Sequence, residues 1–355
     1  MLIRYSIKNG KQVKQAKIYT QAEHKINLAK IDKDAINIIR KLTMKGYDAY
    51  LVGGAVRDLL IGKTPKDFDI TTNATPRVIK KCFRNARIIG KRFQLVHVFF
   101  GDKIFEVSTF RSTENGSVGN QFGTMEEDAQ RRDFTVNTMY FDPINAQLID
   151  FVNGLEDLKN KKLKAVIPLK YLFSEDPVRM IRAVKYSVLT ECKIGFFLSR
   201  KIKKSAGLLE EISHSRLTEE MNKIINSGHA HDIIKKLIEY RLYQYLQPNA
   251  CVYLEENTDN FQTNYFESLA ALDQEVQAGN IKRRGMELYY LICDFLQMVF
   301  KNVGKKAGIF FYDEARHFIL PLNPQREELR YAVISFMRKN NLYKPKRKRK
   351  VPNKA

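Results

Sequence analysis

Residues 66–72 read KDFDITT and place two aspartates one residue apart in a strand-like segment. Successive side chains of a β-strand point to opposite faces, so Asp67 and Asp69 share one face while Phe68 and Ile70 share the other, where they can enter a core. Neighbouring carboxylates repel each other unless a positive group lies between them. Mg²⁺ is commonly held by one or two carboxylates together with substrate phosphates. The stretch therefore predicts a metal-binding strand, and the alternative is a solvated turn.

The sequence before this strand predicts a phosphate-binding turn. Residues 47–62 read YDAYLVGGAVRDLLIG, which is an apolar strand ending at Val52, a glycine pair and a short helix. Glycine lets the backbone approach a phosphate closely, and the start of a helix offers free N–H groups. We therefore expect Gly53 and Gly54 to cradle a triphosphate near the metal. A plain strand-to-helix turn is the alternative.

The sequence after this strand predicts a hairpin that adds a third carboxylate. QLVHVFF and KIFEVSTF flank a turn at residues 101–102, which is typical of two antiparallel strands. In the second strand Ile104, Glu106 and Ser108 share a face, so Glu106 can look toward the same cleft as the aspartates. Between the metal-binding strand and the hairpin, TPRVIKKCF predicts a helix that begins at Pro76.

The composition indicates a polyanionic partner. The 355 residues include 61 Lys and Arg against 39 Asp and Glu, for a formal net charge of +22. Nucleic acid is the usual partner of such a chain, and an anionic membrane surface is the weaker alternative. Four separated cysteines without a CxxC pair argue against a zinc site and a disulfide framework. No long apolar run or signal peptide is present, so we expect no membrane span and a cytoplasmic location.

Changes in pattern along the chain divide it into five segments. Residues 1–25 are read as a polar N-terminal arm, 26–150 as an α/β head, 151–240 as a helical neck, 241–340 as a helical body and 341–355 as a basic disordered tail. From Tyr171 onward the pattern is helical to the end. SEDPVRMIRAVKYSVL predicts one helix, with Ser174 or Asp176 as its N-cap.

Five motifs in this order resemble the class II nucleotidyltransferases, the family of bacterial poly(A) polymerases and CCA-adding enzymes. They lie within residues 47–240 and read VGGAVRDLL, KDFDI, FEVSTFR, RRDFTVNTMYFD and SEDPVRMIRAVKY. The resemblance implies a catalytic head with the DNA polymerase beta superfold, a mixed sheet with helices, followed by an all-α neck and body. The neck would recognise the incoming base and bind RNA.

The resemblance also implies roles for residues that match the family's motifs. Asp67 and Asp69 would hold two metal ions, and Glu106 would help align the RNA 3′ hydroxyl. The remaining matches are nucleotide-binding: Gly53, Gly54 and Arg57 in the phosphate turn, Arg132, Asp133 and Asn137 against the sugar and triphosphate, and Asp176 and Arg179, with Arg182 nearby, reading the incoming base in place of a template.

Several of these residues also have plainer readings. Arg57 and Asp58 could pair on a helix surface, and Asp133 could cap a helix. Asp176 and Arg179 could form an exposed i,i+3 pair worth a few tenths of a kcal/mol. The case for function rests on the five motifs occurring together.

The resemblance implies two Mg²⁺ ions, with Mn²⁺ as an alternative, and ATP and RNA 3′ ends as partners, either single-stranded RNA or tRNA. The stretch IIGKRFQLVHVFF is similar to bacterial poly(A) polymerases, and a basic tail such as KPKRKRK is similar to that branch. We therefore expect AMP addition to RNA 3′ ends, the polyadenylation step of mRNA processing. The alternatives are a tRNA CCA-adding enzyme and a non-catalytic RNA-binding protein.

Overall fold

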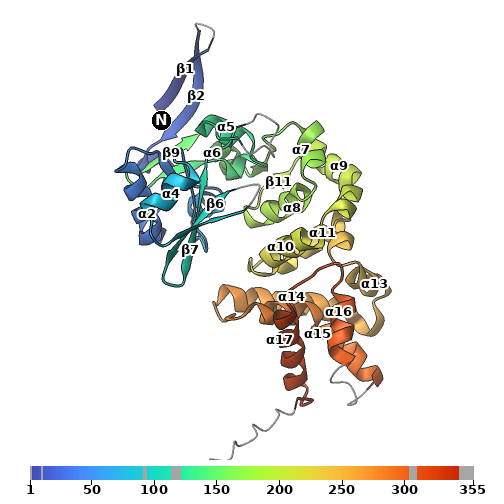
Figure 1. The fold of residues 1–355 in the computed structure, drawn as a ribbon. Helices are drawn as coiled ribbons and strands as arrows, with labels where there is room; N and C mark the ends of the chain where they lie inside the picture. The colour runs from blue at the N-terminus through green and yellow to red at the C-terminus, as the bar shows by residue number, and fades with distance from the viewer. Residues whose placement is uncertain (1, 9–10, 91–93, 113–120, 304–309, 344–355) are drawn as a thin grey trace, which may run out of the picture. The chain divides into compact units, whose positions relative to one another are not determined.

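The computed structural model describes residues 2–8, 11–90, 94–112, 121–303 and 310–343. The chain forms two compact units: a first unit, Met1–Arg179 with Leu189–Lys201, and a second unit, Met180–Val188 with Ile202–Ala355. The first unit contains the strands, and the second is built from helices (Figure 1). The expected α/β head followed by a largely helical region is confirmed. The basic tail of residues 344–355, and with it its predicted disorder, lies outside the described residues.

A mixed sheet of nine strands forms the core of the first unit, in the order β1-β2-β9-β8-β3-β4-β7-β6-β5. The strands are β1 (Leu2–Lys8), β2 (Lys11–Tyr19), β3 (Ala49–Val52), β4 (Asp69–Thr72), β5 (Ala86–Ile89), β6 (Leu95–Phe100), β7 (Lys103–Thr109), β8 (Tyr140–Asp142) and β9 (Gln147–Asp150). β4 runs parallel to β7, whereas β3 is antiparallel to both β4 and β8. The strand that carries Asp69 therefore lies inside the sheet, with a partner on each side.

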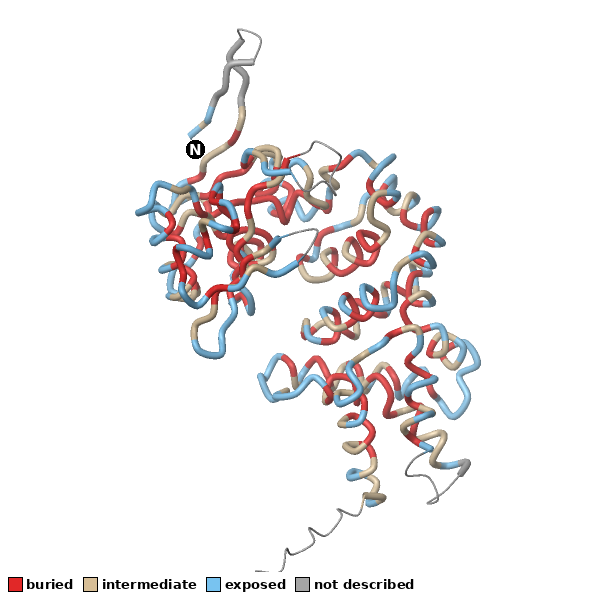
Figure 2. Tube along the Cα trace, viewed as in Figure 1, coloured by how far each residue is buried: buried red, intermediate tan, exposed pale blue. Residues whose placement is uncertain are grey.

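The N-terminal residues differ from their reading as a polar arm. β1 and β2 form an antiparallel hairpin, and β2 continues the sheet by pairing Lys17 with Asp150 of β9. Ala16 of β2 is buried in one apolar cluster with Val52, Phe110 and other residues of the head. Backbone pairing and this cluster join the hairpin to the sheet. Buried residues, red in Figure 2, fill the interior of this unit.

Short helices complete the first unit. They are α1 (Gln21–His24), α2 (Lys33–Thr43), α3 (Gly54–Leu60), α4 (Pro76–Cys82), α5 (Met125–Gln130), α6 (Gly154–Lys159) and α7 (Leu169–Glu175), with 3-10 turns η1 (Leu28–Lys30) and η2 (Thr135–Asn137). Asp32 caps α2 by accepting a hydrogen bond from the Asp34 backbone N–H. α2 then buries Ile38, Ile39 and Leu42, each worth about 1.5–3 kcal/mol relative to exposure. α4 begins at Pro76, as its sequence predicts.

The transition into the helical region differs from its prediction in two places. A two-stranded parallel sheet, β10 (Lys162–Leu163) with β11 (Lys193–Ile194), interrupts the helical pattern. Ser174 lies inside α7 and is not an N-cap. Asp176 is the first residue after α7, and its carboxylate accepts a hydrogen bond from the Val178 backbone N–H at 3.3 Å, just before α8 (Arg179–Leu189).

The remaining helices are α9 (Phe196–Ser205), α10 (His214–Ile225), α11 (Ala230–Glu239), α12 (Tyr243–Leu246), α13 (Pro248–Glu256), α14 (Phe261–Gln277), α15 (Arg284–Val303), α16 (Phe310–Phe318) and α17 (Arg326–Lys339), with 3-10 segments η3 (Ala206–Glu211) and η4 (Thr258–Asn260). Aromatic packing joins several of them: the rings of Phe295 and Phe318 stack at 4.2 Å. Across the described ranges, every helix is too short or too polar to cross a bilayer.

Candidate active site

The two aspartates lie at the start of β4, and their faces match the alternation in the sequence. Phe68 and Ile70 are buried, whereas Asp67 and Asp69 are exposed. Asp69 pairs with Val52 of β3, which ends directly before the glycine pair. The two carboxylates are therefore accessible to solvent at the first residue of β4 and just before it, next to the predicted phosphate turn.

Glu106 lies on the parallel neighbour of this strand. Ile70 of β4 pairs with Val107 of β7, so the residues before them, Asp69 and Glu106, occupy adjacent positions on the same face. On its other side Glu106 faces His97 of β6, with 4.0 Å between Glu106 Oε2 and His97 Nε2. Asp67 and Asp69 at the start of β4 and Glu106 in the middle of β7 therefore come from two neighbouring strands.

The chemistry of these side chains suits a hard divalent cation. Carboxylate oxygens are the ligands Mg²⁺ prefers, and Mg²⁺ usually takes only one or two of them, with the rest of its shell from water and phosphate. Within the part of the chain that the structure describes, no three His, Cys, Asp or Glu side chains gather into a cluster able to hold a metal ion. The exposed pair Asp67 and Asp69 fits a shell completed by substrate, whereas a closed cage that includes Glu106 does not form.

The glycine pair forms the turn between β3 and α3. Gly53 has a φ of +70°, which lies in the left-handed region that favours glycine. A Cβ atom placed on Gly53 would lie 3.8 Å from Arg132 Nη1 and 3.8 Å from Asp69 Oδ2. The turn, the strand that carries Asp69 and the RRDFTVN motif therefore meet at one point.

A chain of hydrogen bonds joins the α3 motif to the RRDFTVN motif. Arg57 is buried, and its Nη1 donates to Asn137 Oδ1 at 2.9 Å, while Nε and Nη2 donate to Asp58 Oδ1. Asn137 Nδ2 in turn donates to Asp133 Oδ1 at 3.4 Å. Arg57 does pair with Asp58, but it also fixes Asn137, so a surface pair alone does not describe it.

Asp128 of α5 organises the arginines of this region, and sequence reasoning missed it. Its buried carboxylate accepts hydrogen bonds from Arg132 Nη2 at 2.9 Å, from Arg131 Nε at 2.9 Å and from the Tyr140 hydroxyl at 2.9 Å. Burial by itself would raise the pKa of this carboxyl, but the neighbouring Arg132 and Arg131 guanidiniums lower the pKa to about 2. Asp128 therefore stays ionised and fixes Arg132 beside Gly53.

Comparison with known protein families agrees with this geometry. Residues 49–164 match the family described as "Poly A polymerase head domain", which spans the residues from the glycine turn through Asn137. Residues 198–254 match the family described as "Probable RNA and SrmB- binding site of polymerase A". The first match covers the sheet positions of the candidate site, and the second lies in the helical region.

A poly(A) polymerase I from Salmonella typhi is 40% identical over 332 residues, which are 88% of this chain and 70% of that protein. The chain belongs to the class II nucleotidyltransferase family. A poly(A) polymerase I from Escherichia coli O6:H1 is also 40% identical, over 262 residues, and the matched part spans only 56% of that relative's length. A CCA-adding enzyme from Lactobacillus helveticus is 34% identical over 228 residues, 61% of this chain and 57% of its own length.

Solved structures of the same nucleotidyltransferase family share the fold. The CCA-adding enzyme of Bacillus stearothermophilus in complex with CTP is similar with a TM-score of 0.55 and 25% identity, over 85% of this chain and 82% of that one. The likeness extends beyond the head to the helical region.

The predicted base-reading residues of this nucleotidyltransferase lie on both sides of the boundary between α7 and α8. The Arg179 guanidinium is buried and donates to the Leu172 backbone carbonyl at 2.9 Å and to Glu175 at 3.3 Å. In the second unit, Arg182 Nε donates to Glu220 at 3.0 Å. Glu220 is itself buried and accepts from Lys185 Nζ at 2.7 Å. Each of these two arginines therefore has a protein partner that fixes its orientation.

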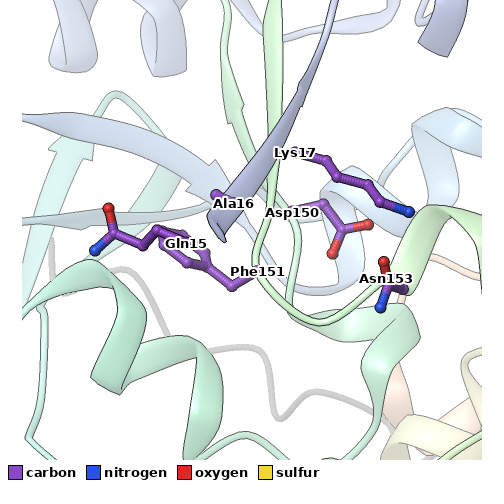
Figure 3. Close-up of a pocket in the computed structure, with 6 residues that line it drawn as sticks. All are labelled: Gln15, Ala16, Lys17, Asp150, Phe151 and Asn153. Atoms are coloured by element: carbon purple, nitrogen blue, oxygen red, sulfur yellow. The ribbon is translucent and has the colours of Figure 1, made fainter. Parts of the chain in front are cut away.

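The nucleotidyltransferase head also contains a cavity of about 200 Å³ away from the aspartates (Figure 3). Its lining residues come from β2 and from the segment after β9: Gln15, Ala16, Lys17, Asp150, Phe151 and Asn153. The Asp150 carboxylate accepts backbone hydrogen bonds from Val152, Gly154 and Leu155, so it organises the start of α6. Asp67, Asp69 and Glu106 are not among the residues that line this cavity.

Proposed function

We propose that the protein is a template-independent polynucleotide adenylyltransferase that adds AMP from ATP to RNA 3′ ends. The observation that carries the proposal is the meeting of three motif elements at Gly53, where the Asp69 carboxylate and the Arg132 guanidinium both approach the glycine turn. A triphosphate needs close backbone approach, positive charge and a metal site, and these elements supply all three.

In the proposed reaction, the RNA 3′ oxygen attacks the α-phosphorus of ATP. A new P–O bond forms, the bond between the α- and β-phosphates breaks, and pyrophosphate leaves. The metal ions that Asp67 and Asp69 would hold, Mg²⁺ or Mn²⁺, would lower the pKa of the 3′ hydroxyl and stabilise charge on the leaving group. Glu106 would help to orient the RNA 3′ end.

The remaining residues would position ATP. Gly53 and Gly54 admit the phosphates, and Arg132 offsets their charge. Arg57 holds Asn137 in place, so that Asn137 and Asp133 can face the sugar and triphosphate. Asp176 and Arg179, with Arg182 one turn further along α8, would form hydrogen bonds with the base. Such contacts would select adenine without a template strand.

Poly(A) addition is favoured over CCA addition by the relatives. Identity to poly(A) polymerase I is 40% over 88% of the chain, against 34% over 61% for a CCA-adding enzyme. The stretch IIGKRFQLVHVFF also supports this choice, although its residues 91–93 are outside the described part. With ATP and RNA as substrates, we expect the reaction to take place in the cytoplasm.

The test supplies purified protein and Mg²⁺ with two RNAs, a tRNA that lacks its CCA end and an unstructured oligonucleotide, in ATP alone or ATP with CTP. We expect a long ladder from ATP alone on the unstructured RNA. Growth of the tRNA by only a few nucleotides, dependent on CTP, would instead identify CCA addition. If neither RNA is extended, the protein binds RNA without catalysis.

A paired experiment tests the metal site. Asp67→Ala should abolish incorporation while RNA binding in a gel-shift assay stays close to that of the parent protein. Asp102→Asn is the matched control, because Asp102 is an exposed acidic residue of the same unit in the turn before β7. Equal turnover by Asp67→Ala and the parent would reject the assignment.

A further inference from the structure

Two adjacent phenylalanines are exposed at the start of α9. Phe196 is 72% exposed and Phe197 is 76% exposed. Their ring centroids lie 5.6 Å apart with an interplanar angle of 75°, so the two side chains form one aromatic pair. Single exposed apolar residues are common on protein surfaces, but a contiguous pair of large rings indicates a surface that binds something.

The sequence between Glu191 and Glu210, which carries this pair, is basic. Residues 192–209 read CKIGFFLSRKIKKSAGLL and contain no aspartate or glutamate. Arg200 and Lys201 follow Phe196 and Phe197 by four positions, so each cation lies on the same side of the helix as one of the rings. Lys193 of β11 is exposed just before the helix. An aromatic pair beside cations matches a partner that has both flat apolar groups and negative charges.

We propose that Phe196 and Phe197 form a stacking platform for unpaired bases of an RNA strand whose phosphates contact Arg200 and Lys201. Proteins that bind single strands without sequence preference combine these two features, because every base has a π-face and every nucleotide a phosphate. Residues 192–209 offer cations but no acidic side chain, so they complement the uniform negative charge of an RNA backbone better than the mixed charges of a typical protein surface. Both phenylalanines lie just before the matched region 198–254.

The platform deepens the proposed function, on which the choice of RNA as partner rests. A polymerase that extends its own product must hold a growing tail whose sequence is uniform and whose length changes. Stacking suits that task, because each adenine can occupy the platform in turn without a change in contacts. Adenine also presents a large π-face, so oligo(A) is the appropriate probe.

The test measures binding of a labelled oligo(A) of about 12 nucleotides by fluorescence anisotropy, without ATP and with chelator present. The second probe is an abasic strand of the same length and charge. We expect the Phe196→Ala/Phe197→Ala variant to bind oligo(A) about tenfold more weakly than the parent protein, while both bind the abasic strand equally. Because the two side chains are exposed, the variant should keep its thermal unfolding midpoint.

Two further variants separate stacking from charge. Arg200→Gln/Lys201→Gln should weaken binding of both probes and reduce the slope of log K against log salt by roughly 1 to 1.5. Phe310→Ala, which removes another partly exposed ring, should bind both probes like the parent. The proposal is overturned if the double phenylalanine variant binds oligo(A) within twofold of the parent protein. It is also overturned if the affinities of this variant for oligo(A) and for the abasic strand fall by the same factor. Since no nucleotide is added in this assay, a failure of the proposed polymerase activity would leave its result unaffected.

Discussion

Replacing Asp128 by asparagine should destabilise the first unit by about 2–4 kcal/mol at neutral pH. The variant keeps the size of the side chain but removes the charge that Arg131 and Arg132 share. The carboxyl is buried, so solvent cannot replace the lost interaction. The two guanidiniums would then be left without their common counter-charge.

The magnitude follows from the folded-state pKa of Asp128. Arg132 and Arg131 lower that pKa from 3.8 to about 2 against the effect of burial. Each pKa unit corresponds to about 1.4 kcal/mol, which gives roughly 2.5 kcal/mol for the ionised form. Removing one partner of a buried ion pair costs about 3–5 kcal/mol in other proteins, so the value from the pKa lies just below that range.

The loss of stability in Asp128→Asn should depend on pH. Because the folded-state pKa is lower than the unfolded value, the stabilisation is present above about pH 4 and is lost as pH falls toward 2. The difference in stability between the parent protein and Asp128→Asn should be constant above about pH 5. It should shrink between about pH 4 and pH 2, as followed by circular dichroism in urea.

The assay at neutral pH labels buried cysteines during urea unfolding and locates the label by mass spectrometry. Cys82 reports on the first unit and Cys293 on the second, and both are buried thiols. The urea midpoint of the Cys82 transition should be lower in Asp128→Asn than in the parent protein. In the exposed control Asp102→Asn, the free energy of unfolding should stay within about 0.5 kcal/mol of the parent value. A Cys82 transition that does not move would refute the argument that Asp128 is a charged anchor.

Three further predictions follow from single contacts. Arg179→Ala should reduce the preference for ATP over other nucleotides, measured by single-nucleotide incorporation; an unchanged preference would remove Arg179 from base reading. Glu220→Gln should destabilise the second unit by about 2–4 kcal/mol at pH 7, because Lys185 and its other cationic partners lower the pKa of this buried carboxyl to about 2. Labelling of Cys293 during urea unfolding checks this, and an unchanged urea midpoint would contradict it. Gly154→Ala should lower the thermal unfolding midpoint, since its Cβ would clash with the Thr135 carbonyl oxygen; an unchanged midpoint would contradict this.

The head strands could be predicted where alternation and turn residues agree. β6 and β7 follow the predicted segments, because one buried and one more open face leave a period of two in the sequence. β4 covers the second half of its predicted segment, and its last three residues are all buried. β5 was missed because its four residues follow α4 too closely to show a period. The polar sequence of residues 1–25 predicts an arm and not strands, whereas backbone pairing with β9 decides the structure of β2.

Only the site residues that lie within the five motifs could be predicted from the sequence. Asp69, Gly53 and Arg132 meet as the motif order implies. Asp128 follows two glutamates at the start of α5, where acidic residues are expected to face water and favour the helix dipole. Only its burial against Arg132 and Tyr140 distinguishes it, and burial depends on contacts distant in sequence.

The pairing of β2 with β9 has a consequence for how the protein is made. Lys17 finds its partner only when Asp150 is available, and Val52 of β3 likewise waits for Tyr140 of β8. A sheet closed by such distant pairs folds slowly, since long loops must close before their contacts stabilise anything. During synthesis the first strands therefore leave the ribosome well before their neighbours. Until residues 140–150 follow, β2 and β3 each have an unpaired edge that chaperones could protect.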